Sequence, residues 1–285
     1  MSDVLASLAS FLPTGAGLAL AVIAGLSFAT WIASVVRHDA SLVDRMWPVF
    51  FGAAAITYVV ARQAAGMAPS PRALAVAALV LAWALRLCAY ITRRNRGHGE
   101  DRRYQDIRAR NEPGFAWKSL YLVFALQALL AWVIAWPVGV AIAASSPLGV
   151  LDVAGLALGL FGASYEAVAD AQMARFRAEP ANRGRVMDRG LWGLSRHPNY
   201  FGEACTWWGV WLVAVGGAGL AAAWCVVSPL LITTLLLKVS GVALLEKDIG
   251  DRRPGYRDYI ERTPAFLPRW PRRAGARPVS REDRR

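Results

Sequence analysis

Polar side chains are concentrated in residues 190–203, which read GLWGLSRHPNYFGE and run directly into an apolar stretch. Pro198 suits the first turn of a helix, and the residues after it then fall in its first turns. Asn199 and Glu203 lie four residues apart on one helical face, with Tyr200 between them. A helix start offers free N–H groups and a partial positive charge to a phosphate or a carboxamide oxygen. A structural cap needs one polar residue, so this excess of polar residues favours a ligand site.

A second polar helix end reads YEAVADAQMARFR and covers residues 165–177. Residues at three- and four-residue steps share one helical face, namely Glu166, Asp170, Met173 and Arg177. One explanation is a ladder of ion pairs, each worth roughly 0.2–0.5 kcal/mol. The other is a ligand, because carboxylates near lipid require partners. In that case Asp170 would bind ribose hydroxyls and Arg177 a phosphate.

An arginine-rich segment, TRRNRGHGEDRRY, covers residues 92–104. Arg86 precedes it, about a turn and a half inside the end of an apolar stretch, where it either faces a wet cavity or snorkels to the interface. Asn95 and Arg96 belong to a glycine-flanked run that could wrap a phosphate through guanidinium and amide donors. Neither GxGxxG nor GxxxxGK[ST] occurs, so a Rossmann or P-loop nucleotide site is not supported.

The C-terminal segment closes the last apolar stretch with Glu246 and continues with Tyr256 and Tyr259. An interfacial helix with tyrosines at headgroup level explains the tyrosines and leaves Glu246 unexplained. The three cysteines show no CxxC spacing and no pairing with histidines. We therefore expect neither a disulfide framework nor a metal site.

The elements that position these residues are apolar runs long enough to cross a membrane. The chain has 285 residues, of which 56% are hydrophobic, more than the ~45–50% typical of soluble domains. A span needs about 20 apolar residues. The sequence predicts an all-α polytopic membrane protein with seven transmembrane helices, at about 16–36, 47–65, 72–91, 117–144, 148–168, 203–219 and 221–245, with a kink at Pro137. Residues 1–270 are expected to form a single domain and 271–285 a basic, disordered tail.

The basic residues indicate the orientation of these helices. The net charge is +12, and arginines gather in loops 92–116 and 169–202 and in the tail after 246. The positive-inside rule then places the N-terminus outside and the C-terminus in the cytoplasm, as an odd number of spans also requires. This distribution fits anionic membrane lipids better than nucleic acid. The polar segments therefore all face the cytoplasm, where a soluble charged ligand can bind while an apolar one enters from the bilayer.

Four segments together resemble the steroid 5-alpha-reductase superfamily, most closely its bacterial branch, which carries the label of a domain of unknown function. They are RNRGHGEDRRY, ADAQMARFR, GLWGLSRHPNYFGE with the WWG after it, and the C-terminal RPGYRDYIERTPAFLP. The resemblance covers the chain from about Asp39 to Pro268. It implies seven transmembrane helices in a bacterial inner membrane, with NADPH bound in a cavity that faces the cytoplasm.

The resemblance also implies roles for individual residues. Asp170 and Arg177 resemble contacts to the adenosine ribose and its phosphate, and Asn199 and Glu203 resemble contacts near the nicotinamide. The full set of implied cofactor contacts is Arg86, Asn95, Arg96, Asp170, Arg177, Asn199, Tyr200, Glu203 and Glu246. The implied reaction is hydride delivery to a carbon–carbon double bond conjugated to a ketone, while an acid polarises the carbonyl oxygen.

The substrate side departs from the superfamily. In the animal steroid enzymes a Glu and a Tyr clamp the ketone; here Asp44 and Trp83 stand in the corresponding positions as the expected catalytic residues. Because an indole is not an acid, the substrate is left open between a steroid-like molecule and another lipid enone.

Two alternatives to a reductase remain. One is an S-adenosylmethionine-dependent membrane methyltransferase of the isoprenylcysteine type, which carries a similar Arg-His-Pro segment; the other is a non-catalytic membrane protein. The oligomeric state is not predicted.

Overall fold

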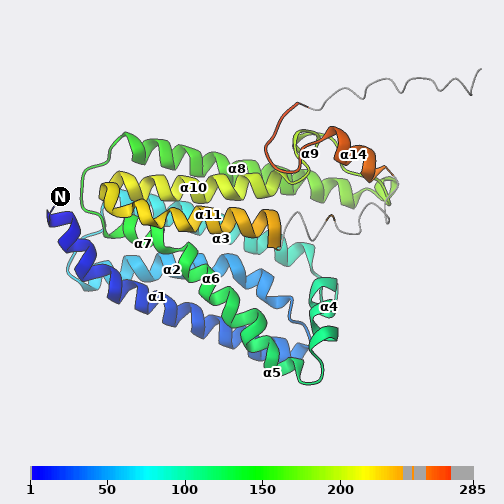
Figure 1. Cartoon of the computed structure of the whole chain (residues 1–285), viewed down its shortest axis with the longest axis horizontal. Helices are drawn as coiled ribbons and strands as arrows, with labels where there is room; N and C mark the ends of the chain where they lie inside the picture. The colour runs from blue at the N-terminus through cyan, green and yellow to red at the C-terminus, as the bar shows by residue number, and fades with distance from the viewer. Residues whose placement is uncertain (1, 240–245, 247–254, 271–285) are drawn as a thin grey trace, which may run out of the picture. The chain divides into compact units, whose positions relative to one another are not determined.

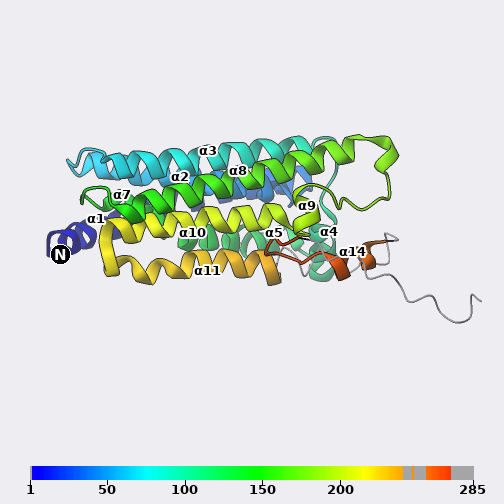
Figure 2. The same ribbon diagram turned by 90° about the horizontal axis from the view of Figure 1, so that it is seen from above.

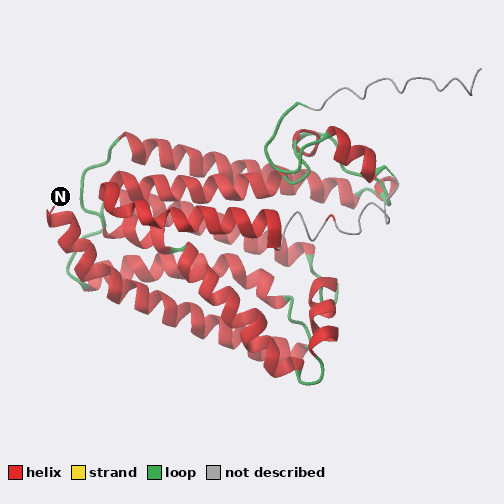
Figure 3. Ribbon diagram, in the orientation of Figure 1, coloured by secondary structure: helices red, strands yellow, loops and turns green. Residues whose placement is uncertain are grey.

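The structure is a computed structural model that describes residues 2–239, 246 and 255–270. This part of the chain is about 80% helical and contains no strand, which confirms the predicted all-α class. Figure 3 shows the described residues as helices joined by loops. The tail expected at 271–285 lies outside the described residues.

Figure 1 labels the helices along the chain. The N-terminal half contains α1 (Ser2–Arg37), α2 (Leu42–Ala64), α3 (Pro71–Arg94), α4 (Arg102–Asn111), α5 (Phe115–Ser119), the π-helical η1 (Leu120–Ala125), α6 (Leu126–Ile134) and α7 (Trp136–Ala143). The C-terminal half contains α8 (Val150–Ala178), η2 (Pro180–Asn182), α9 (Leu191–Leu194), α10 (Pro198–Ala218), η3 (Gly219–Val226), α11 (Val227–Thr234), η4 (Leu235–Val239) and α14 (Tyr256–Arg262).

The chain divides into two compact units. Unit 1 comprises Met1–Ala163 and Ala204–Ile232, and unit 2 comprises Ser164–Glu203 and Thr233–Arg285. Helices α8 and α10 each contribute residues to both units. The single domain expected for residues 1–270 stays a prediction.

Five stretches of the described chain are long and apolar enough to cross a membrane, namely Phe11–Arg37, Pro71–Arg94, Phe115–Ala143, Val150–Ala178 and Pro198–Lys238. They indicate an integral membrane protein. Helix α2, expected as the second span, is not among them; it carries Asp44 in its first turn and Arg62 in its last. The fifth stretch is 41 residues long and covers both the sixth and the seventh expected spans.

The chain reverses direction inside that fifth stretch. Gly219 has a φ of +62°, a conformation that glycine adopts without strain, and the 3-10 helix η3 begins there. Figures 1 and 2 both show α10 and α11 side by side on either side of this turn. The kink expected at Pro137 is also confirmed, because α6 ends before it and α7 begins with Pro137 in its first turn.

Glycines allow α8 and α10 to pack closely in unit 1. A Cβ built on Gly155 would lie 2.7 Å from the carbonyl oxygen of Gly209, and one built on Gly209 would lie 2.5 Å from the nitrogen of Gly159. Gly155 and Gly159 form a GxxxG pair, the spacing that lets membrane helices approach backbone to backbone. A side chain at any of these positions would push the two helices apart.

Two buried arginines tie the loops at one end of unit 1. The Arg72 side chain is 1% exposed, and its Nε and Nη2 donate to Asp152 at 2.6 and 2.8 Å. Arg62 Nη1 donates to the carbonyls of Ile142 and Ala143 at 2.6 and 2.9 Å. Both guanidiniums therefore satisfy groups at the ends of helices and in the loops between them.

Unit 2 is held together by hydrogen bonds between segments that are distant in the sequence. The Trp192 indole donates to the carbonyl of Ala169 in α8 at 2.9 Å. The Arg196 amide donates to the carbonyl of Pro264 at 2.9 Å, and the Arg269 amide donates to that of Leu194 at 3.0 Å. The polar segment before α10 is thus fixed between α8 and the segment that contains α14.

Candidate functional site

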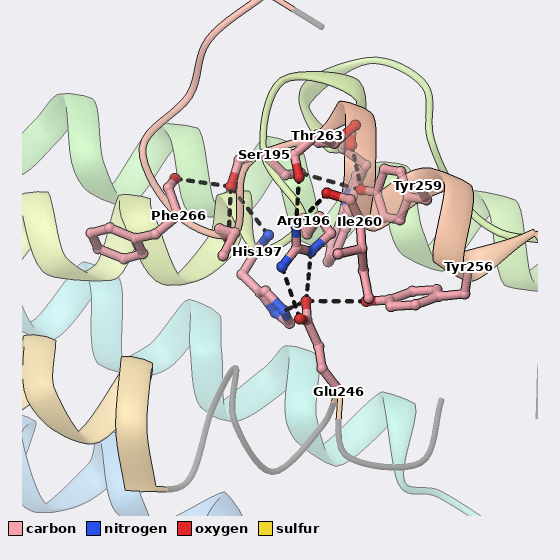
Figure 4. Close-up of polar contacts among 11 residues, drawn as sticks. Ser195, Arg196, His197, Glu246, Tyr256, Tyr259, Ile260, Thr263 and Phe266 are labelled. Atoms are coloured by element: carbon pink, nitrogen blue, oxygen red, sulfur yellow. Dashed lines mark hydrogen bonds and ion pairs between the residues drawn. The ribbon is translucent and has the colours of Figure 1, made fainter. Parts of the chain in front are cut away.

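The polar segment 190–203 is centred on Arg196, which is 9% exposed. Its Nε and Nη2 donate to the two oxygens of Glu246 at 2.7 and 2.8 Å, and its Nη1 donates to the carbonyls of Thr263 and Ile260 at 2.5 and 3.2 Å. Figure 4 shows the guanidinium between Glu246 and the end of α14. A two-point ion pair combined with carbonyl contacts is among the strongest arrangements available to arginine.

His197 and two tyrosines complete what we call the Arg196 cluster (Arg196, His197, Glu246, Tyr256 and Tyr259). His197 Nε2 lies 2.9 Å from Glu246 Oε1 and donates to it, because a carboxylate only accepts. The Tyr256 hydroxyl donates to the same oxygen at 3.3 Å. The Tyr259 hydroxyl donates to the carbonyl of Trp192. Figure 4 shows the side chains of Arg196, His197 and Tyr256 converging on Glu246.

The electrostatic balance in the cluster keeps Glu246 ionised. Burial raises the pKa of its carboxyl group, but the hydrogen bonds from His197 and Arg196 outweigh burial and lower that pKa to about 2. Glu246 therefore carries a full negative charge at neutral pH, and Arg196 neutralises it.

The first turn of α10 contains the residues expected at the nicotinamide. The ring of Tyr200 stacks parallel to that of His197, with centroids 5.3 Å apart and an interplanar angle of 3°. Asn199 Oδ1 is buried and accepts no hydrogen bond from the described part of the chain. Glu203 is 7% exposed. The helix start thus presents an acceptor that the described residues do not satisfy.

Helix α8 supplies two further buried carboxylates to unit 2. Glu166 and Asp170 are 2% and 4% exposed and lie four residues apart. Arg177, expected at a phosphate, is exposed near the end of the helix. Gln172, on the same helix, accepts from the amide of Leu191 at 2.9 Å and connects α8 to the polar segment.

Unit 1 contains a second polar cluster around Asp44, which we call the Asp44 cluster (Asp44, Asp101, Arg103, Tyr104 and Gln127). Asp44 accepts from Arg103 Nη2 at 2.7 Å and from the Tyr104 hydroxyl at 2.6 Å. Gln127 Nε2 donates to the same hydroxyl at 3.2 Å. The Tyr104 phenol therefore donates to Asp44 while it accepts from Gln127.

Helix α4 positions Arg103 and Tyr104. Asp101 caps its first turn by accepting from the Arg103 amide at 3.0 Å, and it also accepts from Arg103 Nε at 3.0 Å. Burial and then the charge of Asp44 raise the pKa of Tyr104 well above its usual value. The phenol stays protonated at neutral pH and can act as a hydrogen bond donor.

The remaining residues expected from the sequence occupy different surroundings in unit 1. Trp83 is 1% exposed, and its ring packs edge-on against Phe51 and Trp207 at 5.6 and 5.5 Å, so it belongs to an aromatic core. Arg86 is partly buried, whereas Asn95 caps the end of α3 and Arg96 is exposed. Their roles toward a cofactor or substrate stay predictions, as do those of the residues in unit 2.

Sequence reasoning missed several residues that the structure places at the centre of the two clusters. Arg196 and His197 lie inside GLWGLSRHPNYFGE, but the spacing did not show that both reach Glu246. Arg103 and Tyr104 end the segment RNRGHGEDRRY, whose composition suggested a phosphate site, and instead they contact Asp44. Among the described residues, no group of three or more His, Cys, Asp or Glu side chains could hold a metal ion.

Comparison with known proteins identifies the family. Residues 30–263 match a family model described as "Protein of unknown function (DUF1295)". The chain belongs to the DUF1295 family. It is also 26% identical over 264 residues to a protein of Schizosaccharomyces pombe described as "Uncharacterized protein C594.04c", covering 84% of this chain and 75% of that protein. No solved structure matches this chain with significance.

The DUF1295 match includes all members of both clusters, from Asp44 to Tyr259. It ends at Thr263, whose carbonyl oxygen accepts from Arg196. The Asp44 and Arg196 clusters are therefore built from the part of the chain that defines the family.

Proposed function

We propose that this DUF1295 protein is an NADPH-dependent membrane oxidoreductase that reduces a conjugated carbon–carbon double bond in a steroid-like or other lipid enone. The match to DUF1295 supports the resemblance of its motifs to the steroid 5-alpha-reductase superfamily.

Asn199 is the observation that carries the proposal. Its Oδ1 is buried and unpaired among the described residues, and an unsatisfied buried acceptor costs about 1–3 kcal/mol. A bound group that donates a hydrogen bond would remove that cost, and the carboxamide N–H₂ of nicotinamide is such a group. The residues at the start of α10 therefore fit the cofactor that the motifs imply. NADPH would supply the hydride when bound.

The α8 residues in unit 2 support the adenosine end. Asp170 is buried, and a carboxylate there can accept hydrogen bonds from ribose hydroxyls. Arg177 lies two turns further along the helix and is exposed, so its guanidinium can bind the 2′-phosphate that distinguishes NADPH from NADH. S-adenosylmethionine has no phosphate, so such an arginine favours the reductase over the methyltransferase.

The Asp44 cluster is the candidate for carbonyl activation. Tyr104 has a single O–H, which it donates to Asp44, while Gln127 donates to the phenol oxygen. When a ketone binds, this O–H turns from Asp44 to the ketone oxygen, and the new hydrogen bond polarises the enone toward hydride addition. The superfamily has a tyrosine at the position of Trp83, and Tyr104 supplies the missing hydroxyl. We therefore assign Tyr104 the role of the group that polarises the ketone oxygen.

We propose seven spans, with the N-terminus outside and the C-terminus in the cytoplasm of a bacterial inner membrane. The five apolar stretches become seven when α2 is included and the 41-residue stretch is divided at its turn. The two arginines near the loop at 65–70 are both buried in contacts with helix ends. Because these two arginines have structural partners, they do not count against the orientation. The excess of arginine in loops 92–116 and 169–202 supports it.

The test measures NADPH binding to the full chain in detergent by nicotinamide fluorescence. Asn199→Ala should weaken binding by roughly two- to tenfold, the value of one hydrogen bond. Asn111→Ala is the matched control, because Asn111 bonds locally to the carbonyl of Ile107 in α4. Equal affinity in wild type and Asn199→Ala would contradict the assignment, and binding of S-adenosylmethionine in place of NADPH would establish the methyltransferase.

A second experiment compares the affinities of NADPH and NADH. Arg177→Ala should weaken NADPH by roughly ten- to a hundredfold and NADH little, because a charge-assisted contact to phosphate is lost. Arg175→Ala removes an exposed arginine from the same helix and should leave the ratio unchanged. A parallel loss for both nucleotides in Arg177→Ala would place the 2′-phosphate elsewhere.

A further inference from the structure

A cavity of about 270 Å³ lies in unit 1 among α1, α2, α6, α7 and η3. Three tryptophans form much of its wall: Trp136 is in contact with Trp132 and with Trp224, at centroid distances of 5.1 and 5.2 Å. Leu12 and Ala16 of α1 add to its apolar lining. A cavity of about 150 Å³ is large enough to hold benzene, so this Trp-lined cavity is large enough for an apolar ligand.

Tyr58 brings one polar atom to the wall of this cavity. The side chain is fully buried, and its hydroxyl has no hydrogen bond partner in the described part of the chain. Its ring fits against glycine: a Cβ on Gly139 would lie 2.7 Å from the hydroxyl-bearing carbon, and one on Gly15 would lie 3.2 Å from Cδ1. Phenylalanine would fill the same space without burying an unpaired hydroxyl, which is unfavourable. The hydroxyl therefore requires a partner, and the described residues do not supply it.

The position of the cavity indicates what can enter it. Trp136 lies about 10 Å along the helix from the end of the candidate span at Ala143, a depth near the membrane interface. Trp224 is 50% exposed and belongs to the apolar stretch Pro198–Lys238, so this wall of the cavity reaches the surface of a candidate span. Tryptophans concentrate at this level of the membrane. At the membrane interface, the ester groups of glycerolipids place carbonyl oxygens at the headgroup end of the acyl chains.

We infer that the Trp-lined cavity binds one chain of a bilayer glycerolipid, with the ester carbonyl accepting a hydrogen bond from the Tyr58 hydroxyl. The apolar wall accommodates the chain, and the ester satisfies the one buried polar atom. None of these residues belongs to the Asp44 or Arg196 cluster, so the inference does not depend on the proposed function.

The experiment compares two probes by native mass spectrometry of the full chain in detergent: diacyl phosphatidylcholine, and a dialkyl-ether phosphatidylcholine with the same chains. The ether lipid lacks the carbonyl acceptor. Wild type should retain one diacyl lipid and prefer it over the ether lipid by about two- to tenfold, as expected for one hydrogen bond. Tyr58→Phe should lose this preference and bind both lipids as weakly as wild type binds the ether lipid.

Two controls separate the ester contact from general lipid binding. Tyr121→Phe removes the hydroxyl of a residue that is 60% exposed and should behave as wild type. Ala16→Leu narrows the cavity and should reduce binding of both probes, with thermal unfolding used to verify folding. The inference is overturned by any of three results: an unchanged ester preference in Tyr58→Phe, no ester preference in wild type, or no bound lipid in wild type.

Discussion

The Asp44 and Arg196 clusters use the same chemical groups in different ways. Each places a carboxylate against a guanidinium and a phenol. In the Arg196 cluster all three guanidinium nitrogens donate, and the contacts join the start of α10 to Glu246 and the end of α14. In the Asp44 cluster Arg103 is 29% exposed, and it contacts Asp44 through a single nitrogen.

This difference indicates a structural role for the Arg196 cluster and supports the chemical role that we propose for the Asp44 cluster. Four hydrogen bonds to Glu246, Thr263 and Ile260 use every nitrogen of the Arg196 guanidinium, so a ligand there would compete with contacts that hold unit 2 together. Asp44 lies in the first turn of α2, and its partners Arg103 and Tyr104 lie on the short helix α4, so these contacts can be exchanged at lower cost. Buried polar residues therefore indicate a reactive site when some of their hydrogen bonding capacity is left for a ligand.

The largest expected effect is on the Arg196 cluster. Arg196→Ala leaves the partly buried Glu246 charged without its guanidinium partner, which should lower the free energy of unfolding by about 2–3 kcal/mol, less than for a fully buried pair because Glu246 is 15% exposed. Arg262→Ala is the matched control, because its contact to Asp188 is between side chains that are 41% and 31% exposed; it should cost about 1 kcal/mol or less. Unfolding in detergent measures both, and equal losses would show that Arg196 is not the structural centre of unit 2.

A smaller effect should follow pH through Glu246. Its pKa in the folded state, about 2, lies below the value of about 4.3 expected in the unfolded chain. The stability contributed by the carboxylate is therefore fully present above about pH 4.3 and is lost as pH falls toward 2, by on the order of 2 kcal/mol. Glu246→Gln should be less stable at pH 7 and show a weaker loss between pH 5 and 3. An identical pH profile for both proteins would argue against the ion pair.

The smallest effect on stability is expected in the Asp44 cluster, together with a large effect on activity. Tyr104→Phe removes the hydrogen bonds to Asp44 and Gln127 and should cost only about 1 kcal/mol. If Tyr104 polarises the ketone, the variant should bind NADPH normally and lose most reduction of a 3-keto-4-ene steroid probe, followed by NADPH absorbance. Tyr121→Phe should retain both. A Tyr104→Phe variant that reduces the probe at the wild-type rate would remove Tyr104 from the reaction.

The sequence alone predicted the helical class, the helix break at Pro137 and the reversal near residue 220, and six of its seven expected spans overlap the five apolar stretches. These features are local, because helical hydrogen bonds join residues four apart and a span is a run of consecutive apolar residues. The same locality placed Asn199 and Glu203 in the first turns of a helix, as the structure does, whereas the ligand site expected in GLWGLSRHPNYFGE stays a prediction.

The partners of the charged residues were decided by the tertiary structure. The chain has 32 Lys and Arg and 20 Asp and Glu, so composition offers many possible ion pairs. Arg196 meets Glu246 across 50 residues, and Tyr104 meets Asp44 across 60, because helix packing brings their backbones together. The close approach of Gly155 and Gly209 has the same origin. Such contacts depend on the volume and direction of packed helices, which no local spacing along the chain records.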